Sequence, residues 1–305
     1  MNQNSKSIQN HDLHNSVHDR CILCKTTAPQ EMPEYAGDGL VRCQKCGFVF
    51  CQRIPTEAEL IAHYGTYSRS EWISPITLSR YNELLKKFET YRKNNRILDV
   101  GAGNGHFLYT AKQSGWEVYG TEFTDEAIRL CRQKGIQMHQ GKLDPKNYAG
   151  EFDVVTSFEV IEHINDPAEE LQKFRQVLRT GGLVYITTPN FNALARNMAK
   201  SDWAIIEYPE HLCYYTPQTL KQAFTQEGFE AYRIQTTGID LSRRKSLKKT
   251  QNTNTTETLT QANRDSGLRS KVERIPLLRL AKKLINLILT TLGKGDTIKA
   301  YFIKR

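Results

Sequence analysis

A glycine-rich turn between an apolar run and a helix constrains this chain more than any other feature. The apolar run from Ile97 to Val100 leads into Gly101, Gly103 and Gly105, in the sequence ILDVGAGNGHF. Glycine leaves the backbone open to a ligand, and the amides that begin the next helix can bind an anionic group. The pattern predicts a strand, a tight turn and a helix that bind a cofactor. The alternative interpretation is that these residues form an ordinary strand-to-helix turn of an α/β domain.

The spacing and charge of this turn distinguish two classes of cofactor. A dinucleotide site has the pattern G-x-G-x-x-G, but here the third glycine falls at Gly105, and His106 occupies the position expected for it. Asp99 at the strand end would repel a pyrophosphate, whereas it suits a cofactor that carries an ammonium and a sulfonium group. S-adenosylmethionine (SAM) carries both groups, so the sequence favours SAM over a nicotinamide dinucleotide.

The following residues alternate between strand-like runs and helical spacing. Glu122 ends the next run, at about the distance from the turn at which a carboxylate meets ribose hydroxyls, and Phe123 offers a flat face to adenine. Further strands are predicted at Ile136 to His139, Phe152 to Ser157 and Leu183 to Thr187. Their carboxyl ends meet at one edge of a sheet, where open α/β folds bind their ligands.

Together these motifs resemble the class I SAM-dependent methyltransferases, specifically the branch that includes ubiquinone-type O-methyltransferases. The resemblance covers about residues 95 to 238 and rests on LDVGAGNG at Leu98 to Gly105, VYGTE at Val118 to Glu122, FDVV at Phe152 to Val155, VIEHINDP at Val160 to Pro167, LRTGGLVYITTPN at Leu178 to Asn190 and PEHLCYYTPQTL at Pro209 to Leu220. It implies an α/β fold with a Rossmann-like, doubly wound, seven-stranded and mostly parallel sheet. It also implies an enzyme that transfers the SAM methyl group to a small molecule.

The same resemblance implies roles for individual residues. The methionine part of SAM is expected among Asp99, Gly101, Gly103 and Gly105; Glu122 is expected to bind ribose, Phe123 and Leu143 to flank adenine, and Phe158 and Glu159 to line the methyl-donor pocket. A hydroxyl acceptor also needs a base. Glu162, His163 and His211 follow predicted strands and are the candidates, and a structural hydrogen bond is the alternative for either histidine.

Four cysteines near the amino terminus form two C-x-x-C pairs. Cys21 and Cys24 are separated from Cys43 and Cys46 by eighteen residues, which is a zinc-knuckle spacing. Four thiolates close a tetrahedral site, so zinc is expected to hold structure rather than to take part in chemistry. The alternative is two dithiol pairs or disulfides. Because the chain shows no signal-peptide pattern, we expect a cytoplasmic protein whose thiols stay reduced.

These features divide the chain into six expected segments. They are a flexible tail at 1–15, a zinc ribbon at 16–55, a helical cap or linker at 56–94, a SAM-binding methyltransferase domain at 95–240, a basic, partly disordered insertion at 241–294 and a final strand at 295–305. The final strand is assigned because one strand is missing after the run Phe229 to Gln235, and a β-like run recurs at Thr297 to Ile303.

Some sugar C-methyltransferases resemble this combination of cysteine module and catalytic domain. A sugar substrate is not carried over from them; the acceptor is expected to belong to one of three classes, sugar-derived, quinone-like or lipid-linked.

Positive charge is concentrated at the carboxyl end of the chain. Residues 241–305 contain sixteen Lys and Arg and four Asp and Glu, a balance of +12, so residues 1–240 carry −3 of the total of +9. An RNA methyltransferase would ordinarily surround its pocket with cations, so this distribution counts against a nucleic-acid substrate. RNA methylation, with the zinc ribbon and basic tail binding RNA, is kept as the alternative. A non-catalytic protein that binds SAM is the other alternative.

An amphipathic basic helix is predicted at Ile275 to Leu292, within the insertion. Its apolar face carries Leu277, Leu278, Ala281, Leu284, Ile285, Ile288 and Leu292, and its other face carries Arg279, Lys282, Lys283 and Asn286. We expect the apolar face to pack on the sheet. The alternative is a peripheral contact with an anionic membrane at its inner surface, which could admit a lipid-linked substrate. The sequence does not predict an oligomeric state.

Overall fold

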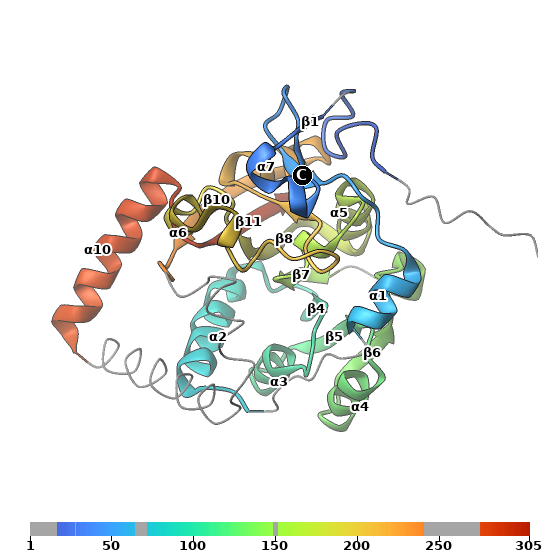
Figure 1. Ribbon diagram of the computed structural model, residues 1–305. Helices are drawn as coiled ribbons and strands as arrows, with labels where there is room; N and C mark the ends of the chain where they lie inside the picture. Colours follow the sequence, from blue (N-terminus) through green and yellow to red (C-terminus); the bar gives the residue numbers. More distant parts are fainter. Residues whose placement is uncertain (1–16, 28, 65–71, 149–151, 241–274) are drawn as a thin grey trace, which may run out of the picture.

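The computed structural model describes residues 17–27, 29–64, 72–148, 152–240 and 275–305 (Figure 1). The expected flexible tail and residues 241–274 of the insertion lie outside the described residues. The helices are α1 (Glu57–Tyr64), α2 (Pro75–Phe88), α3 (His106–Gln113), α4 (Asp125–Gln133), α5 (Pro167–Val177), α6 (Leu194–Ala199), α7 (Pro217–Gln226) and α10 (Pro276–Leu292), with short 3-10 helices η1 (Pro33–Asp38), η2 (Glu89–Tyr91), η3 (Pro145–Asn147), η4 (Ile161–His163) and η5 (Lys200–Asp202). The strands are β1 (Gln30–Glu31), β2 (Leu40–Arg42), β3 (Val49–Cys51), β4 (Arg96–Val100), β5 (Glu117–Glu122), β6 (Gln137–Gln140), β7 (Phe152–Phe158), β8 (Leu178–Pro189), β9 (Cys213–Tyr214), β10 (Phe229–Thr237) and β11 (Thr297–Lys304).

Seven of these strands form one sheet in the order β10-β11-β8-β7-β4-β5-β6. The pairs from β8 to β6 are parallel, whereas β11 runs antiparallel to both β8 and β10. The last strand of the chain therefore enters the sheet between two strands that precede the insertion. This arrangement confirms the expected Rossmann-like, mostly parallel sheet and the assignment of Thr297 to Ile303 as its missing strand.

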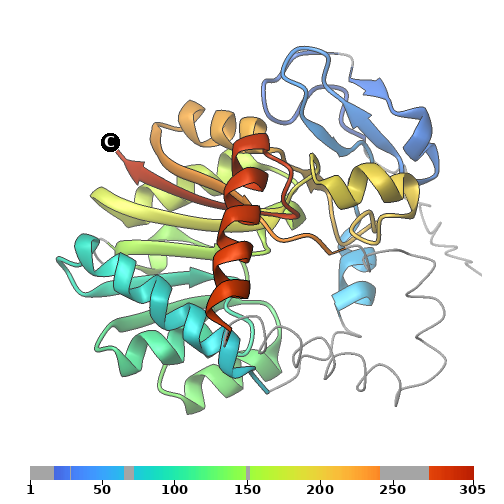
Figure 2. The same ribbon diagram turned by 90° about the vertical axis from the view of Figure 1, so that its left-hand side faces the viewer.

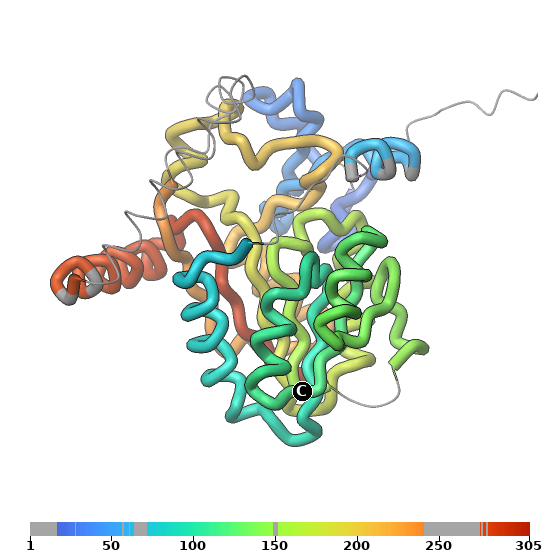
Figure 3. Tube along the Cα trace, turned by 90° about the horizontal axis from the view of Figure 1, so that it is seen from below, coloured from blue at the N-terminus to red at the C-terminus, as the bar shows by residue number. Residues whose placement is uncertain are grey.

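Helices α2, α3, α5 and α7 cover the two faces of this sheet, because each turns apolar side chains toward it. On one face, Phe174 of α5 and Phe224 of α7 join a core that includes Phe302 of β11, whose ring stacks on Phe224 with centroids 3.7 Å apart. On the other face, Phe88 of α2 and Phe107 of α3 pack on the strands. Figure 3 shows α2 and α3 side by side along the sheet. The doubly wound arrangement leaves the carboxyl edge of the strands to the loops.

For the helix that follows β7, the sequence predicts a start at Asp166-Pro167 and a stop at Gly181-Gly182. The Asp166 side chain accepts a hydrogen bond from the Glu169 amide, 3.2 Å away, and Pro167 occupies the first turn. The prediction that the glycine pair after Thr180 stops this helix is wrong. The helix ends at Val177, and β8 begins at Leu178. The pairing of β8 with β7 shifts register between Leu178, which lies opposite Phe152, and Leu183, which lies opposite Val154.

A second, four-stranded sheet joins the amino-terminal module to the larger domain. Its order is β1-β2-β3-β9, and β9 comes from the loop that follows β8. Phe48 packs against Tyr215 with ring centroids 5.0 Å apart, and both belong to the same buried core as the strands of the large sheet. Figure 2 shows the blue module beside the end of the large sheet at which β11 begins. The expected zinc ribbon therefore shares its core with the domain instead of forming a separate body.

Helix α10 forms where the sequence predicts, but its packing is the reverse of the expectation. The apolar side chains that were expected to face the sheet are 41–74% exposed: Leu277, Leu278, Leu284, Ile285, Ile288 and Leu292. Ala281 on the same face is exposed as well. The side turned to the body is largely polar, because Asn286 and Thr290 hydrogen-bond with the end of β10. Figures 1 and 3 both show α10 standing out from the side of the sheet.

The shared core predicts that the whole protein unfolds in one transition. Replacing Phe48, which is fully buried, with alanine should lower the free energy of unfolding by about 3–5 kcal/mol. Calorimetry should show one peak that moves as a unit, and Tyr232→Ala, at an exposed ring on β10, should change stability by about 0.5 kcal/mol or less. Two peaks, with only the smaller one affected by Phe48→Ala, would mean that the module folds independently.

Candidate active site

The glycine turn after β4 approaches two neighbouring segments too closely for side chains. Gly101 and Gly105 both have a positive φ, of 75° and 70°. A Cβ atom on Gly101 would lie 2.5 Å from Cγ2 of Val160, and one on Gly105 would lie 2.6 Å from Sγ of Cys131. Glycine is therefore required at both positions for conformational and steric reasons. The turn packs directly against the residues that follow β7.

Two carboxylates flank this turn. The Asp99 side chain is buried and accepts a hydrogen bond from the Thr156 hydroxyl, 2.7 Å away. Burial raises the pKa of Asp99 to about 7; the Thr156 hydrogen bond opposes this rise, and the Glu122 carboxylate adds to it. Glu122 accepts hydrogen bonds from the Gly103 amide at 2.9 Å and the Phe123 amide at 2.8 Å. A cationic ligand between the two carboxylates would therefore be stabilised by both.

The other predicted cofactor residues lie at different depths around the same strand ends. Phe123 is 60% exposed beside Glu122, where its ring can contact a ligand, whereas Leu143 is buried in the core. The half-buried Phe158 packs on Phe107 with ring centroids 4.9 Å apart. Glu159 is exposed and has a φ of 52°, a conformation that is rare for a residue with a side chain and common at functional sites. The roles of these residues in SAM binding stay predictions.

A pair of histidines lies beside the end of β7. His163 on η4 and His211 before β9 have ring centroids 4.8 Å apart, although they are 48 positions apart in the chain. Nδ1 of His163 is 2.6 Å from the carbonyl oxygen of Glu210, and Nδ1 of His211 is 2.5 Å from that of Ile205. A carbonyl oxygen can only accept, so each Nδ1 carries a proton, and in the neutral form of each ring Nε2 holds the lone pair of a base. Burial, and then the neighbouring His211, lowers the pKa of His163 to about 4.

Glu162 completes this group and is almost fully buried, with 2% of its surface exposed. Its Oε2 accepts a hydrogen bond from the Thr188 hydroxyl, 3.0 Å away, while Oε1 has no hydrogen-bond partner among the described residues. Burial, and then the charge of Glu159, raises the pKa of Glu162 well above its usual range. Glu162, His163 and His211 offer three ligand atoms within 4.8 Å of one another, so they could also hold a divalent cation.

The structure thus brings the predicted site residues together in two groups at one edge of the sheet. The turn group contains Asp99 and Glu122, the histidine group contains Glu162, His163 and His211, and Val160 packs on Gly101 between them. Sequence reasoning missed Thr156 and Thr188, which orient the buried carboxylates. Both are polar residues inside apolar strands, a signal that could have identified them. It also missed Tyr81 of α2, which packs on Phe158.

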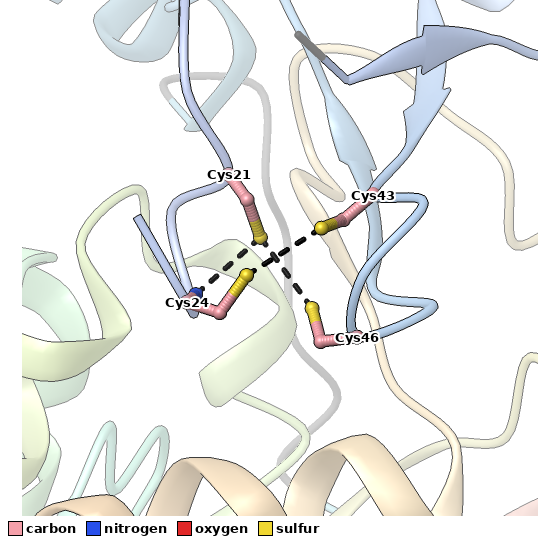
Figure 4. A group of neighbouring side chains, drawn as sticks. All are labelled: Cys21, Cys24, Cys43 and Cys46. Carbon is pink, nitrogen blue, oxygen red and sulfur yellow. Dashed lines mark hydrogen bonds between the residues drawn. The ribbon is translucent and has the colours of Figure 1, made fainter. Parts of the chain in front are cut away.

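The four predicted cysteine ligands converge on one point (Figure 4). Sγ of Cys21 is 3.6 Å from that of Cys46, and Sγ of Cys24 is 3.5 Å from that of Cys43, with no disulfide between them. Zinc–sulfur bonds of 2.3 Å in a tetrahedron would place sulfurs about 3.8 Å apart, so the cluster fits zinc closely. Burial raises the pKa of Cys21 to about 11, so a thiolate there requires a nearby cation.

Comparison with known proteins agrees with this geometry. The profile of a family described as "Methyltransferase domain" matches residues 71–234, which is more than half of the chain. A ubiquinone biosynthesis O-methyltransferase of Aromatoleum aromaticum is 33% identical over 154 residues, covering 46% of this chain and 65% of that protein. The protein of the same name from Leptothrix cholodnii is 27% identical over 129 residues, covering 39% of this chain and 53% of that protein. The chain therefore spans less than two thirds of the length of these relatives.

The fold also matches a solved structure. A methyltransferase from Galdieria sulphuraria superimposes with a TM-score of 0.50 at 16% sequence identity, and the match covers 75% of this chain and 84% of that one. At this level of identity the likeness concerns the fold alone.

The pKa of Asp99 predicts how SAM affinity depends on pH. SAM is cationic, so its predicted position beside Asp99 would favour the ionised carboxylate, and binding below the free pKa of about 7 would release a proton. Affinity measured by calorimetry should therefore fall as pH drops from 7 to 5, by up to about tenfold for each pH unit. Asp99→Asn should bind SAM more weakly at pH 7 and with little dependence on pH. An affinity of the unaltered protein that stays constant over this range would contradict the assignment.

Proposed function

This chain belongs to the SAM-dependent methyltransferase family, and we propose that it methylates a small-molecule hydroxyl acceptor. The observation that carries the proposal is the pairing of an acidic, glycine-lined turn with a histidine pair at the same sheet edge. The curated relatives described above are named O-methyltransferases, which supports an oxygen acceptor. The acceptor is proposed to be sugar-derived, quinone-like or lipid-linked. The charge distribution counts against the RNA alternative, because the residues before 241 carry a net charge of −3.

The proposed chemistry is an in-line transfer with one proton removed. The acceptor oxygen attacks the methyl carbon of SAM, the carbon–oxygen bond forms as the sulfur–carbon bond breaks, and neutral S-adenosylhomocysteine leaves. The hydroxyl proton passes to Nε2 of a histidine. His163 is a weak base because its pKa is lowered to about 4, so His211 is the candidate base. Its Nδ1–H, held by the Ile205 carbonyl, keeps Nε2 in the accepting form.

Replacing His211 with alanine should slow turnover far more than it weakens SAM binding. With 3,4-dihydroxybenzoate as a simple catechol probe, kcat measured by S-adenosylhomocysteine release should fall by about 100- to 10,000-fold. The Kd for SAM should change by less than about threefold, because His211 lies in the histidine group and not at the turn. His139→Ala, at a histidine on β6, is the matched control and should keep its turnover.

Two outcomes would contradict a base at His211. Unchanged kcat in His211→Ala with an accepted substrate would remove the residue from the reaction. A strict need of the unaltered protein for added Mg²⁺ or Mn²⁺ would instead make Glu162, His163 and His211 cation ligands.

We also propose that the four-cysteine cluster binds one structural zinc ion. All four sulfurs lie within 4.8 Å of one another, with two pairs at 3.5 and 3.6 Å, and four thiolate ligands would leave no position for a substrate. The cluster lies next to the pairing of β3 with β9, and one residue, Leu212, separates His211 from β9. Zinc at this position would hold the loop that carries the candidate base.

Zinc content gives a direct test of the cluster. Purified protein should contain about one zinc per chain by mass spectrometry, and Cys24→Ser with Cys43→Ser should contain less than about 0.1. Cys51→Ser alters a cysteine of the same module outside the cluster and should keep its zinc. Protein without zinc, with a mass lower by two hydrogens for each disulfide, would support the dithiol alternative.

A further inference from the structure

Helix α10 presents an apolar surface that no described part of the protein covers. At 3.6 residues per turn, its exposed Leu, Ile and Ala side chains extend over about half of the helix circumference and along its whole length. Leu287 and Leu280 widen this surface and are 63% and 55% exposed. An exposed apolar face of this extent marks an interaction site in a soluble domain.

The attachment of α10 to the body fixes this orientation. The amide of Gly238 donates to the Asn286 side chain at 3.0 Å, and the Thr236 hydroxyl donates to the Leu289 carbonyl at 2.7 Å. The Thr290 hydroxyl donates to the Thr236 carbonyl at 2.9 Å. These bonds lie on the polar side of the helix, opposite Leu284 and Ile288. The apolar face therefore points away from the sheet.

The charge of the helix indicates what covers this face. Residues 275–295 contain four Lys and Arg and no Asp or Glu. Lys282 and Lys283 flank the apolar half, where long cationic side chains can reach a negatively charged surface while the leucines enter an apolar layer. A second copy joined through this face would bring like charges together without acidic partners.

The adjoining residues 241–274 have a polar and basic composition. Residues 241–274 contain four leucines, one valine and one alanine, and no isoleucine, methionine or aromatic residue. They also carry nine Lys and Arg and three Asp and Glu, a balance of +6. This composition offers few apolar side chains to pair with a 17-residue helix, and its charge adds to the attraction toward an anionic surface.

We propose that α10 docks the protein peripherally on an anionic lipid surface. No described helix is long and apolar enough to span a bilayer, so the helix would lie in the interface with its leucines inserted. Its carboxyl end is held at the catalytic edge of the sheet, because the Asn190 side chain, directly after β8, donates to the carbonyls of Gly293 and Gly295. Docking would bring this edge near the membrane surface. The inference does not depend on the proposed methyl transfer.

Vesicle sedimentation tests the proposal with the full chain. The protein should sediment with phosphatidylglycerol–phosphatidylcholine vesicles, and at least tenfold less with phosphatidylcholine alone or in 1 M salt. Leu284→Asn with Ile288→Asn should reduce binding to anionic vesicles at least tenfold. Leu284→Met with Ile288→Leu keeps both positions apolar and should bind like the unaltered protein. Both side chains are more than half exposed, so these variants should fold, and an unchanged Kd for SAM checks this.

Three results would overturn the proposal. The first is no sedimentation with either kind of vesicle. The second is equal sedimentation of the asparagine and conservative variants with anionic vesicles. The third is a dimer that light scattering detects without lipid and that Leu284→Asn with Ile288→Asn dissociates, since a second copy would then cover the face.

Discussion

The turn after β4 can pack only because Gly101 and Gly105 carry no side chains. Val160 and Cys131 occupy the space that a Cβ atom at each position would need. This close packing brings the Gly103 amide within 2.9 Å of the Glu122 carboxylate and ties the residues after β7 to the turn. The turn group and the histidine group are therefore joined by the contact of Gly101 with Val160, and a side chain at Gly101 would separate the two groups.

Burial then determines the chemistry that each group can perform. Asp99 and Glu162 are carboxyl groups in low-dielectric surroundings, and each has a single hydroxyl partner, Thr156 and Thr188 respectively. Their raised pKa values mean that a cation beside either one would be strongly stabilised. His163 responds in the opposite direction, because burial disfavours its charged form. The same burial thus favours the protonated form of Asp99 and Glu162 until a cation lies beside them, and it keeps His163 neutral.

The amino-terminal module contacts the segments that carry the histidine group. The loop with His211 leads into β9, which is held by β3, and the Cys213 thiol donates to the carbonyl of Ile164 just after η4. The His18 side chain is 2.8 Å from the Asn165 carboxamide oxygen on the same segment. The cysteine module and the histidine group are therefore mechanically linked. Their separation in the sequence hides this link.

Local patterns in the chain were sufficient for many features. The apolar runs predicted the strands, the C-x-x-C spacing predicted the cysteine cluster, and the Asp166-Pro167 start of α5 was correct because caps depend on neighbouring residues alone. The glycine spacing identified the turn and favoured SAM, since backbone approach and charge are local properties. The periodicity of residues 275–292 predicted a helix with two distinct faces.

Only the tertiary structure decided how distant segments meet. The path of the chain after β8 brings His211 beside His163, and no local sequence rule specifies a contact between residues 48 positions apart. Periodicity could not tell which face of α10 turns inward. That depends on two hydrogen bonds at the end of the edge strand β10, one that Asn286 accepts from the Gly238 amide and one that Thr290 donates to the Thr236 carbonyl. The sequence determined which segments can form strands, helices, turns or a cysteine cluster, since these follow from neighbours along the chain. Packing between segments decided which side chains share a site, because that energy exists only once the chain has folded.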